Sequence, residues 1–273
     1  MEKSSSAIRL LKKKKMTNDI VQICPLASGS RGNSLFVAFN DTCILVDAGL
    51  SGVEIERRMA SVGIHPGCLN AIIITHEHSD HIKGAGVLSR RFQLPVYMTP
   101  KTHAACPSLG KIDTLHFFEG GQPFQMGQVL VSPFSISHDA CDPVGMTLEY
   151  HHHKIGIATD LGVATALVKT HLKDSSLLYL ESNHDTRMLM NGAYPWHLKQ
   201  RIKSRTGHLS NTETADLLSE LKTHRLKHVI LAHLSEENNC PQKAMTEAGL
   251  RLNGSGIGLH VAGPDKAGKL IQL

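Results

Sequence analysis

A dense run of histidines and carboxylates follows an apolar strand and constrains the fold more than any other feature of the sequence. Ala71–Thr75 is apolar enough for a strand that is buried on both faces. The next six residues include His76, His78, Asp80 and His81. Imidazole and carboxylate groups suit divalent metals, and α/β sheets place ligands at the carboxyl ends of strands. The spacing predicts two neighbouring ions, one bound by His76 and His78 and the other by Asp80 and His81.

Short apolar runs alternate with helical patterns along the rest of the chain. The predicted strands are Val21–Leu26, Ser34–Phe39, Cys43–Asp47, Ala71–Thr75, Val96–Met98, Thr114–Phe118, Val129–Phe134, Met146–Tyr150, Lys154–Ala158, Leu177–Leu180, His228–Leu231 and Gly258–Val261. The predicted helices are Val53–Val62, Ala164–His171, Trp196–Ser204, Thr212–Leu221 and Pro241–Arg251. This mixture indicates an α/β protein with two sheets packed face to face and flanked by helices. No linker rich in Pro, Gly or Ser divides the chain, so residues 17–273 are predicted to form one domain.

Charge and cysteine content narrow the class of protein. The formal net charge of +5 resides entirely in the first fifteen residues, and residues 1–16 are predicted to be a disordered basic tail. No membrane span is expected, because no run approaches ~18 uncharged apolar residues. The six cysteines form no CxxC pair and the start lacks a secretory signal pattern, which indicates reduced thiols and a cytoplasmic location. The oligomeric state stays open.

The segment 76–81 resembles the HxHxDH signature of the metallo-β-lactamase superfamily. The resemblance extends over nearly all of residues 20–273 and implies a four-layer αβ/βα sandwich with a dinuclear site at the edge between its sheets. It also implies three further ligands after apolar runs, namely His138 for the first ion, Asp160 as a carboxylate bridging both ions, and His233 for the second. The histidines at 151–153 are instead expected in a hairpin turn, because consecutive strand residues point to opposite faces.

This ligand set implies hydrolytic chemistry. Two divalent ions, Zn²⁺ or Mn²⁺, lower the pKa of a water between them and offset charge that develops on a substrate oxygen. We count Asp80 among the catalytic residues as well as among the ligands. Sites of this kind hydrolyse phosphodiesters, thioesters or lactams, so residues outside the ligand set must decide the substrate.

A basic segment precedes a Gly-His-Leu-Ser turn in the second half. Residues 197–206 contain four cations and no carboxylate, and the cations form two rows spaced i,i+4 on a helix. A solvated helix face is the alternative for most of these single charges. The turn at 207–210 leads into a helix N-terminus, where backbone N–H groups suit an anionic oxygen. The candidate substrate-binding residues are Lys199, Arg201, Lys203, Arg205, Asn183 and His184.

The same region resembles the phosphodiesterase branch of the superfamily. In that branch a histidine outside the metal ligands contacts the scissile phosphate with support from an acidic residue, and the matching positions are His208 and Glu181. The motifs that together resemble the WalJ (YycJ) group are Ser28–Ser34, Glu181–Asp185, Tyr194–Trp196 and Gly207–Asn211. Members of that group are viewed as 5′ DNA exonucleases, so the resemblance implies DNA as the partner. Arg31 departs from the serine that the group carries at this position.

Taken together, these features predict a dinuclear metallohydrolase that cleaves phosphodiesters as a 5′ exonuclease on DNA. The first alternative is a phosphodiesterase for small cyclic substrates. The second is a glyoxalase-type thioesterase, in which the basic segment and His208 have no evident role. The complete ligand set disfavours a protein that only binds nucleic acid.

Overall fold

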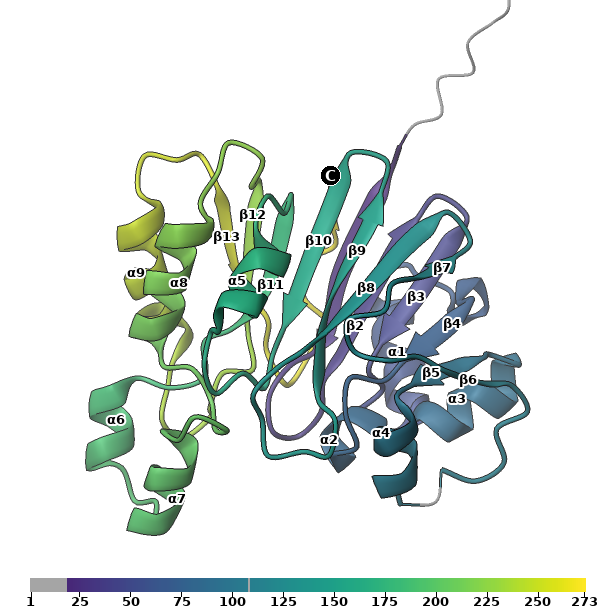
Figure 1. Cartoon of the computed structure of the whole chain (residues 1–273), viewed down its shortest axis with the longest axis horizontal. Coiled ribbons are helices and arrows are strands. Elements are labelled where there is room, and N and C mark those ends of the chain that lie inside the picture. The colour runs from purple at the N-terminus through teal and green to yellow at the C-terminus, as the bar shows by residue number, and fades with distance from the viewer. Residues whose placement is uncertain (1–18, 108) are drawn as a thin grey trace, which may run out of the picture.

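Two mixed sheets of seven strands each lie at the centre of the molecule (Figure 1). The computed structural model describes residues 19–107 and 109–273, and the predicted tail at 1–16 lies outside them. In spatial order the first sheet contains β14 (Ile271–Gln272), β1 (Val21–Ala27), β2 (Ser34–Phe39), β3 (Thr42–Val46), β4 (Ala71–Ile73), β5 (Val96–Met98) and β6 (Leu115–Phe117). The second contains β13 (Gly258–Val261), β12 (His228–Ala232), β11 (Leu177–Glu181), β10 (His153–Ala158), β9 (Val144–Tyr150), β8 (Val129–Ser135) and β7 (Phe124–Met126).

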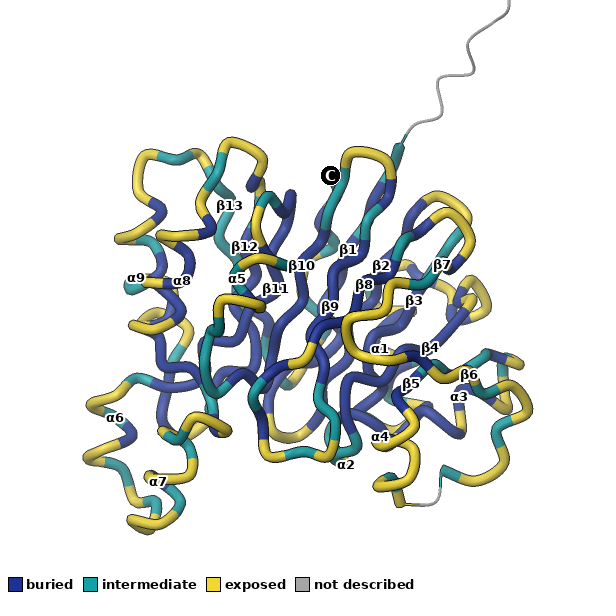
Figure 2. Tube along the Cα trace, in the orientation of Figure 1, coloured by how far each residue is buried: buried dark blue, intermediate teal, exposed yellow. Residues whose placement is uncertain are grey.

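Strand β2 illustrates how both faces of a sheet are buried. All of its residues are buried. Leu35, Val37 and Phe39 belong to a core that residues of both sheets share. Phe36 and Ala38 point the other way, into a second core beneath the outer helices. The strand therefore reads as a continuous apolar run, and burial extends through both sheets in Figure 2.

Helices cover the outer face of each sheet. α1 (Gly52–Ser61) and α3 (Ala85–Phe92) pack on the first sheet. α5 (Ala166–Leu172), α8 (Asn211–Leu221) and α9 (Pro241–Leu252) pack on the second. This arrangement confirms the predicted αβ/βα sandwich.

Shorter helices lie in the connecting loops. They are the 3₁₀ turn η1 (Pro66–Cys68), α2 (Ser79–Ile82), α4 (Pro100–Ala105), α6 (Thr186–Asn191) and α7 (Trp196–Ile202). Figure 1 places α2, α4, α6 and α7 along one edge of the molecule. No helix among the described residues has the length and apolar character needed to cross a membrane.

The predicted strands and helices are all present, with ends that differ by at most two residues. The predicted turn forms at 151 and 152, while His153 already begins β10. The sequence did not predict α3, because this helix contains a glycine that is required by a tertiary contact. Gly86 weakens the helical pattern of α3, yet a Cβ there would lie 1.8 Å from the carbonyl oxygen of Leu109.

Strand direction brings several strand ends to one edge. β3 and β4 are parallel neighbours in the first sheet, and β10, β11 and β12 are parallel neighbours in the second. The residues that end or follow these strands include Asp47, the segment 76–81, Asp160, Glu181 and His233. The order and direction of the strands therefore bring the candidate site residues to the same edge.

Candidate metal centre

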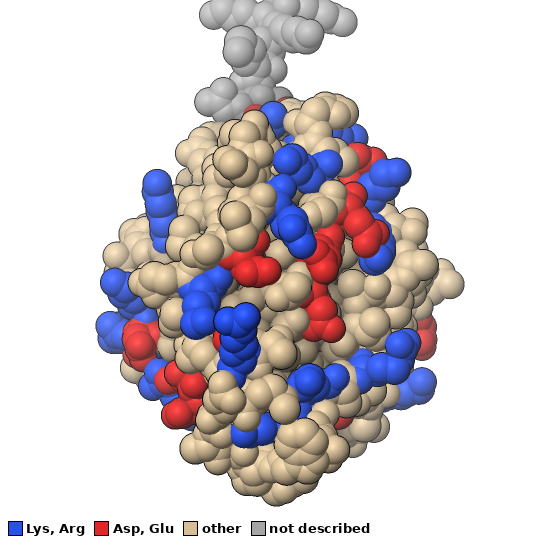
Figure 3. Space-filling view, turned by 90° about the vertical axis from the view of Figure 1, so that its left-hand side faces the viewer, with Lys and Arg blue, Asp and Glu red and all other residues tan. Residues whose placement is uncertain are grey.

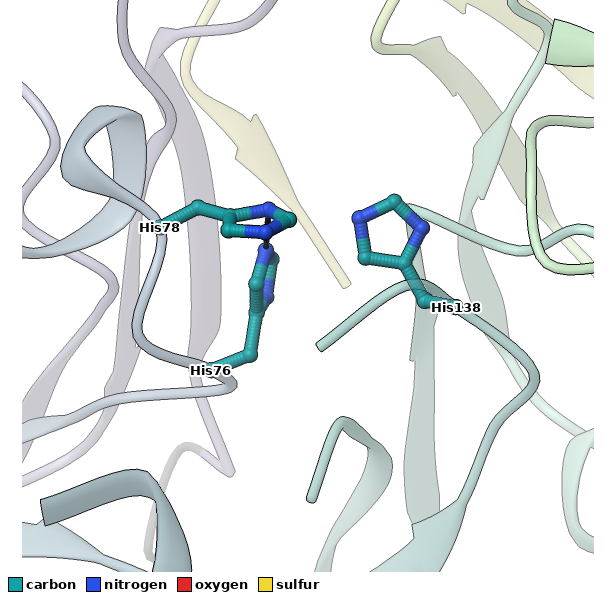
Figure 4. A group of neighbouring side chains, drawn as sticks. All are labelled: His76, His78 and His138. Carbon is teal, nitrogen blue, oxygen red and sulfur yellow. Dashed lines mark hydrogen bonds between the residues drawn. The ribbon is translucent and has the colours of Figure 1, made fainter. Parts of the chain in front are cut away.

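Three histidines converge at the edge between the two sheets (Figure 4). His76 and His78 follow β4 of the first sheet, and His138 follows β8 of the second. Nε2 of His76 lies 3.1 Å from Nδ1 of His78. The ring centre of His138 is 5.1 Å from each of the other two ring centres. The three rings are close enough to share one ion.

A second group surrounds Asp160. Its Oδ2 lies 3.3 Å from Nε2 of His81, while its Oδ1 lies 3.5 Å from Nε2 of His233 and 3.7 Å from Nε2 of His138. Oδ2 of Asp80 lies 3.6 Å from Nε2 of His81. The Asp160 carboxylate thus adjoins candidate ligands of both groups, an arrangement compatible with a carboxylate that bridges two ions.

Buried atoms without partners lie at the centre of these groups. Oδ2 of Asp160 and Nε2 of His233 are buried and have no hydrogen-bond partner among the described residues. Such atoms are rare in folded proteins unless water or an ion completes them. Imidazole nitrogens and carboxylate oxygens are donors that divalent ions accept. The residues present therefore fit a divalent metal.

Glu181 is a fully buried carboxylate that holds two imidazoles. Its Oε1 lies 2.8 Å from Nδ1 of His208 and 2.8 Å from Nδ1 of His233. Its Oε2 accepts hydrogen bonds from the backbone N–H groups of Leu161 and Leu209. Burial opposes ionisation of Glu181, but the two histidines lower its pKa to about 2, so it is charged at neutral pH. Both imidazoles keep Nε2 free of this contact.

Comparison with known proteins agrees with this geometry. A family model described as a beta-lactamase superfamily domain matches residues 42–233. The chain belongs to the metallo-β-lactamase superfamily. Within the superfamily it is 39% identical to exodeoxyribonuclease YycJ of Bacillus anthracis, over 87% of this chain and 91% of that protein. It is 37% identical to exodeoxyribonuclease WalJ of Streptococcus pneumoniae, over 91% of this chain and 96% of that protein.

A solved structure has the same fold. The metallo-β-lactamase fold protein YhfI from Bacillus subtilis has a TM-score of 0.72 and covers 93% of this chain with 100% of its own. At 18% identity, this likeness shows the fold alone. Superfamily membership, the YycJ and WalJ relatives and the donor set together make the chain a metal-dependent hydrolase of the WalJ group.

The predicted substrate-binding residues differ in whether they line a pocket. Asn183 and Arg201 line a pocket of about 190 Å³ together with His208, a predicted catalytic residue. Lys203 and Arg205 are exposed outside that lining. Lys and Arg are interspersed with Asp and Glu on the face shown in Figure 3, so no single-sign patch dominates that face.

Two of the predicted substrate residues have internal contacts. Lys199 is buried, and its ammonium group donates hydrogen bonds to the carbonyl oxygens of Met190 and Gly192. His184 is also buried, and this burial lowers its pKa to about 4. Neither belongs to the described residues that line the pocket. The i,i+4 spacing of the cations does not indicate that the side chain of Lys199 is buried.

The helix N-terminus that was expected to receive an anionic oxygen is capped by its own residues. Ser210 accepts a hydrogen bond from the N–H of Glu213, and the Glu213 carboxylate accepts one from the N–H of Ser210. The N–H of Asn211 donates to the carbonyl oxygen of His184. The expectation of free donors is wrong for these groups, because the capping box and the carbonyl oxygen of His184 already use them.

Two supporting residues were missed at the sequence level. Asp47 accepts from Nδ1 of His81 at 2.8 Å, and Asn33 donates from Nδ2 to Oδ2 of Asp80 at 3.2 Å. Asn33 lies in the Ser28–Ser34 motif, and Asp47 ends a predicted strand. Asp47 could have been found from its position, because a carboxylate at the end of a strand beside the ligand-bearing strand is well placed to support a ligand.

Three residues of the centre adopt the left-handed backbone conformation. Asp47, Asp160 and His233 have φ values of 61°, 56° and 54°. Each follows a strand, so the chain turns sharply where the side chain enters the site. This conformation is uncommon for residues other than Gly and clusters at functional sites.

Proposed function

We propose that the chain is a metal-dependent exodeoxyribonuclease that acts from the 5′ end of DNA. The observation that carries the proposal is the Glu181–His208 pair beside the ligand groups, with Nδ1 of His208 3.9 Å from Oδ1 of Asp160. Two relatives that match along most of the chain bear the name exodeoxyribonuclease, which supports DNA as the substrate. The six free cysteines support a cytoplasmic location.

In this proposal the chain holds two divalent ions, Zn²⁺ or Mn²⁺. His76, His78 and His138 would hold the first ion, Asp80, His81 and His233 would hold the second, and Asp160 adjoins both groups. Bound divalent ions supply Lewis acidity, which activates water at neutral pH and offsets negative charge on a phosphodiester.

His208 protonates the leaving oxygen. Its Nδ1 is taken by Glu181, and the ring lines the pocket, so Nε2 is the nitrogen available to a substrate. The leaving group in DNA is a sugar hydroxyl, which departs poorly as an alkoxide. A positioned proton donor therefore contributes directly to turnover. Glu181 acts as a positioning residue, because its contact with Nδ1 fixes the orientation of the ring.

End-labelled duplex DNA tests this function. The purified protein with Mn²⁺ or Zn²⁺ should release nucleotides progressively from the 5′ end and leave closed circular DNA intact. His208→Ala should be slow on the linear substrate, whereas His197→Ala, an exposed histidine on α7, should match the wild type. Hydrolysis of cyclic nucleotides or a glutathione thioester without DNA cleavage would replace this proposal with one of the alternatives.

A further inference from the structure

The pocket of about 190 Å³ has a mixed lining that differs from the charged metal centre. Two lining residues adjoin the candidate ligands, since His208 groups with Asp160 and His233, and Asn183 donates a hydrogen bond to the carbonyl oxygen of His233. Leu198 and Tyr194, from α7 and the turn before it, contribute an apolar and an aromatic surface. A nucleobase needs such a surface, because every base presents a π face that stacks on aromatic side chains.

The charges in the pocket balance each other. Arg201 is the cation of the lining, and its Nε donates to Oδ2 of Asp139 at 2.7 Å. Asp139 also lies in the lining, so this ion pair adds no net charge to the pocket. A phosphate gains little from a cation that is already paired. An uncharged occupant, such as the base and sugar of one nucleotide, matches the pocket better.

The size of the pocket limits the occupant further. Pockets for drug-sized ligands have volumes of roughly 300–1,000 Å³. A volume of about 190 Å³ lies below this range, which limits the occupant to one nucleoside at most. The pocket adjoins the proposed proton donor, His208. It therefore has space for one nucleotide residue between the scissile phosphodiester bond and the end of the strand.

We propose that this pocket holds the terminal nucleoside of the DNA strand, with its base stacked on Tyr194. The inference rests on the proposed nuclease function and deepens it. A single nucleoside fits between His208 and α7, so cleavage occurs one nucleotide from the strand end. The pocket thus accounts for exonucleolytic cleavage through shape rather than through charge.

The test compares two oligonucleotides that differ only in the 5′-terminal residue, which either carries a base or is abasic. The wild type should cleave the base-bearing strand about tenfold faster in kcat/KM, as loss of one stacked base predicts. In Tyr194→Ala this preference should shrink towards one. Tyr194→Leu, which keeps apolar bulk, should lose it as well, and Tyr194→Phe should retain it.

Trp196→Ala is the matched control, because Trp196 is an exposed aromatic residue two positions away and outside the described pocket lining. It should keep the wild-type preference. A wild type that cleaves both strands equally, or a Tyr194→Leu protein that keeps the preference, would overturn the pocket inference and leave the nuclease function standing. A wild type that cleaves no DNA would overturn both.

Discussion

Asp47 and His81 are 34 residues apart in the chain, yet the Asp47 carboxylate lies 2.8 Å from Nδ1 of the His81 ring. Thr75 donates its N–H and its hydroxyl to the same carboxylate. Nε2 of His81 consequently faces Asp160. Because β3 and β4 are parallel neighbours, the end of one strand orients a candidate ligand that follows the other.

Replacing Asp47 should weaken metal binding. Asp47→Asn keeps the size of the side chain and tolerates the left-handed backbone, but it removes the charge that supports His81. Loss of such an outer partner typically lowers metal affinity about 10–100-fold. Competition with a chromogenic chelator measures the change. Asp113→Asn, at an exposed surface pair, is the control, and equal affinities in the two variants would contradict the role of Asp47.

Metal stoichiometry should separate Asp160 from His233. Asp160 adjoins both groups of donors, so Asp160→Asn should reduce the content of both ions together. His233 lies on one side only, and His233→Ala should spare the ion near His76. Elemental analysis after dialysis against metal-free buffer gives the numbers. A wild type that retains a single ion would rule out the dinuclear centre.

His208→Ala should lower turnover on DNA by about 10²–10⁴-fold, as expected when a proton donor is removed. The metal content should stay unchanged. Bis(p-nitrophenyl) phosphate should suffer a smaller loss, because its phenolate leaving group needs little protonation. Equal losses on the two substrates would assign His208 to binding instead.

Glu181→Gln should affect metal binding and catalysis at once. One carboxylate oxygen serves both His233 and His208, so removal of its charge disturbs a candidate ligand and the proton donor together. The sequence linked Glu181 to His208 alone, whereas the structure also places it against His233. We predict a lower metal affinity in addition to slow turnover. Chelator competition and kinetics at saturating metal distinguish the two effects.

Stability should fall with acid partly through His184. Burial is the largest cause that lowers its pKa to about 4; His208 and Lys203 lower it further, while Glu181 and Glu213 oppose them. In the unfolded chain His184 has its ordinary pKa of about 6.5. Between pH 6.5 and pH 4 the unfolded state therefore binds more protons than the folded state. Stability is therefore lost as the pH falls through this window, by up to about 3 kcal/mol.

Urea unfolding at pH 7 and pH 4.5 measures the contribution of His184. His184→Gln should lose less stability between the two pH values than the wild type. Equal losses in the two proteins would show that His184 does not couple stability to pH.

The dense motif at 76–81 predicted the first ligand candidates, and the resemblance to the superfamily added His138, Asp160 and His233. Each of these three follows an apolar run, and in the structure they follow β8, β10 and β12. Asp47 escaped because its role depends on which strand lies beside β3. Lys199 escaped because its charge is satisfied by two carbonyl groups that only the α6–α7 connection brings near.

The candidate ligands come from both sheets, with His76 and His78 after a strand of the first and Asp160 and His233 after strands of the second. Ions bound there would cross-link halves of the chain that are far apart in sequence. Such a cross-link forms only once both sheets have assembled. Metal would therefore act mainly by slowing unfolding rather than by speeding folding, since contacts absent from the transition state are reflected in the unfolding rate. Removal of the metal would therefore be seen chiefly as a faster unfolding rate.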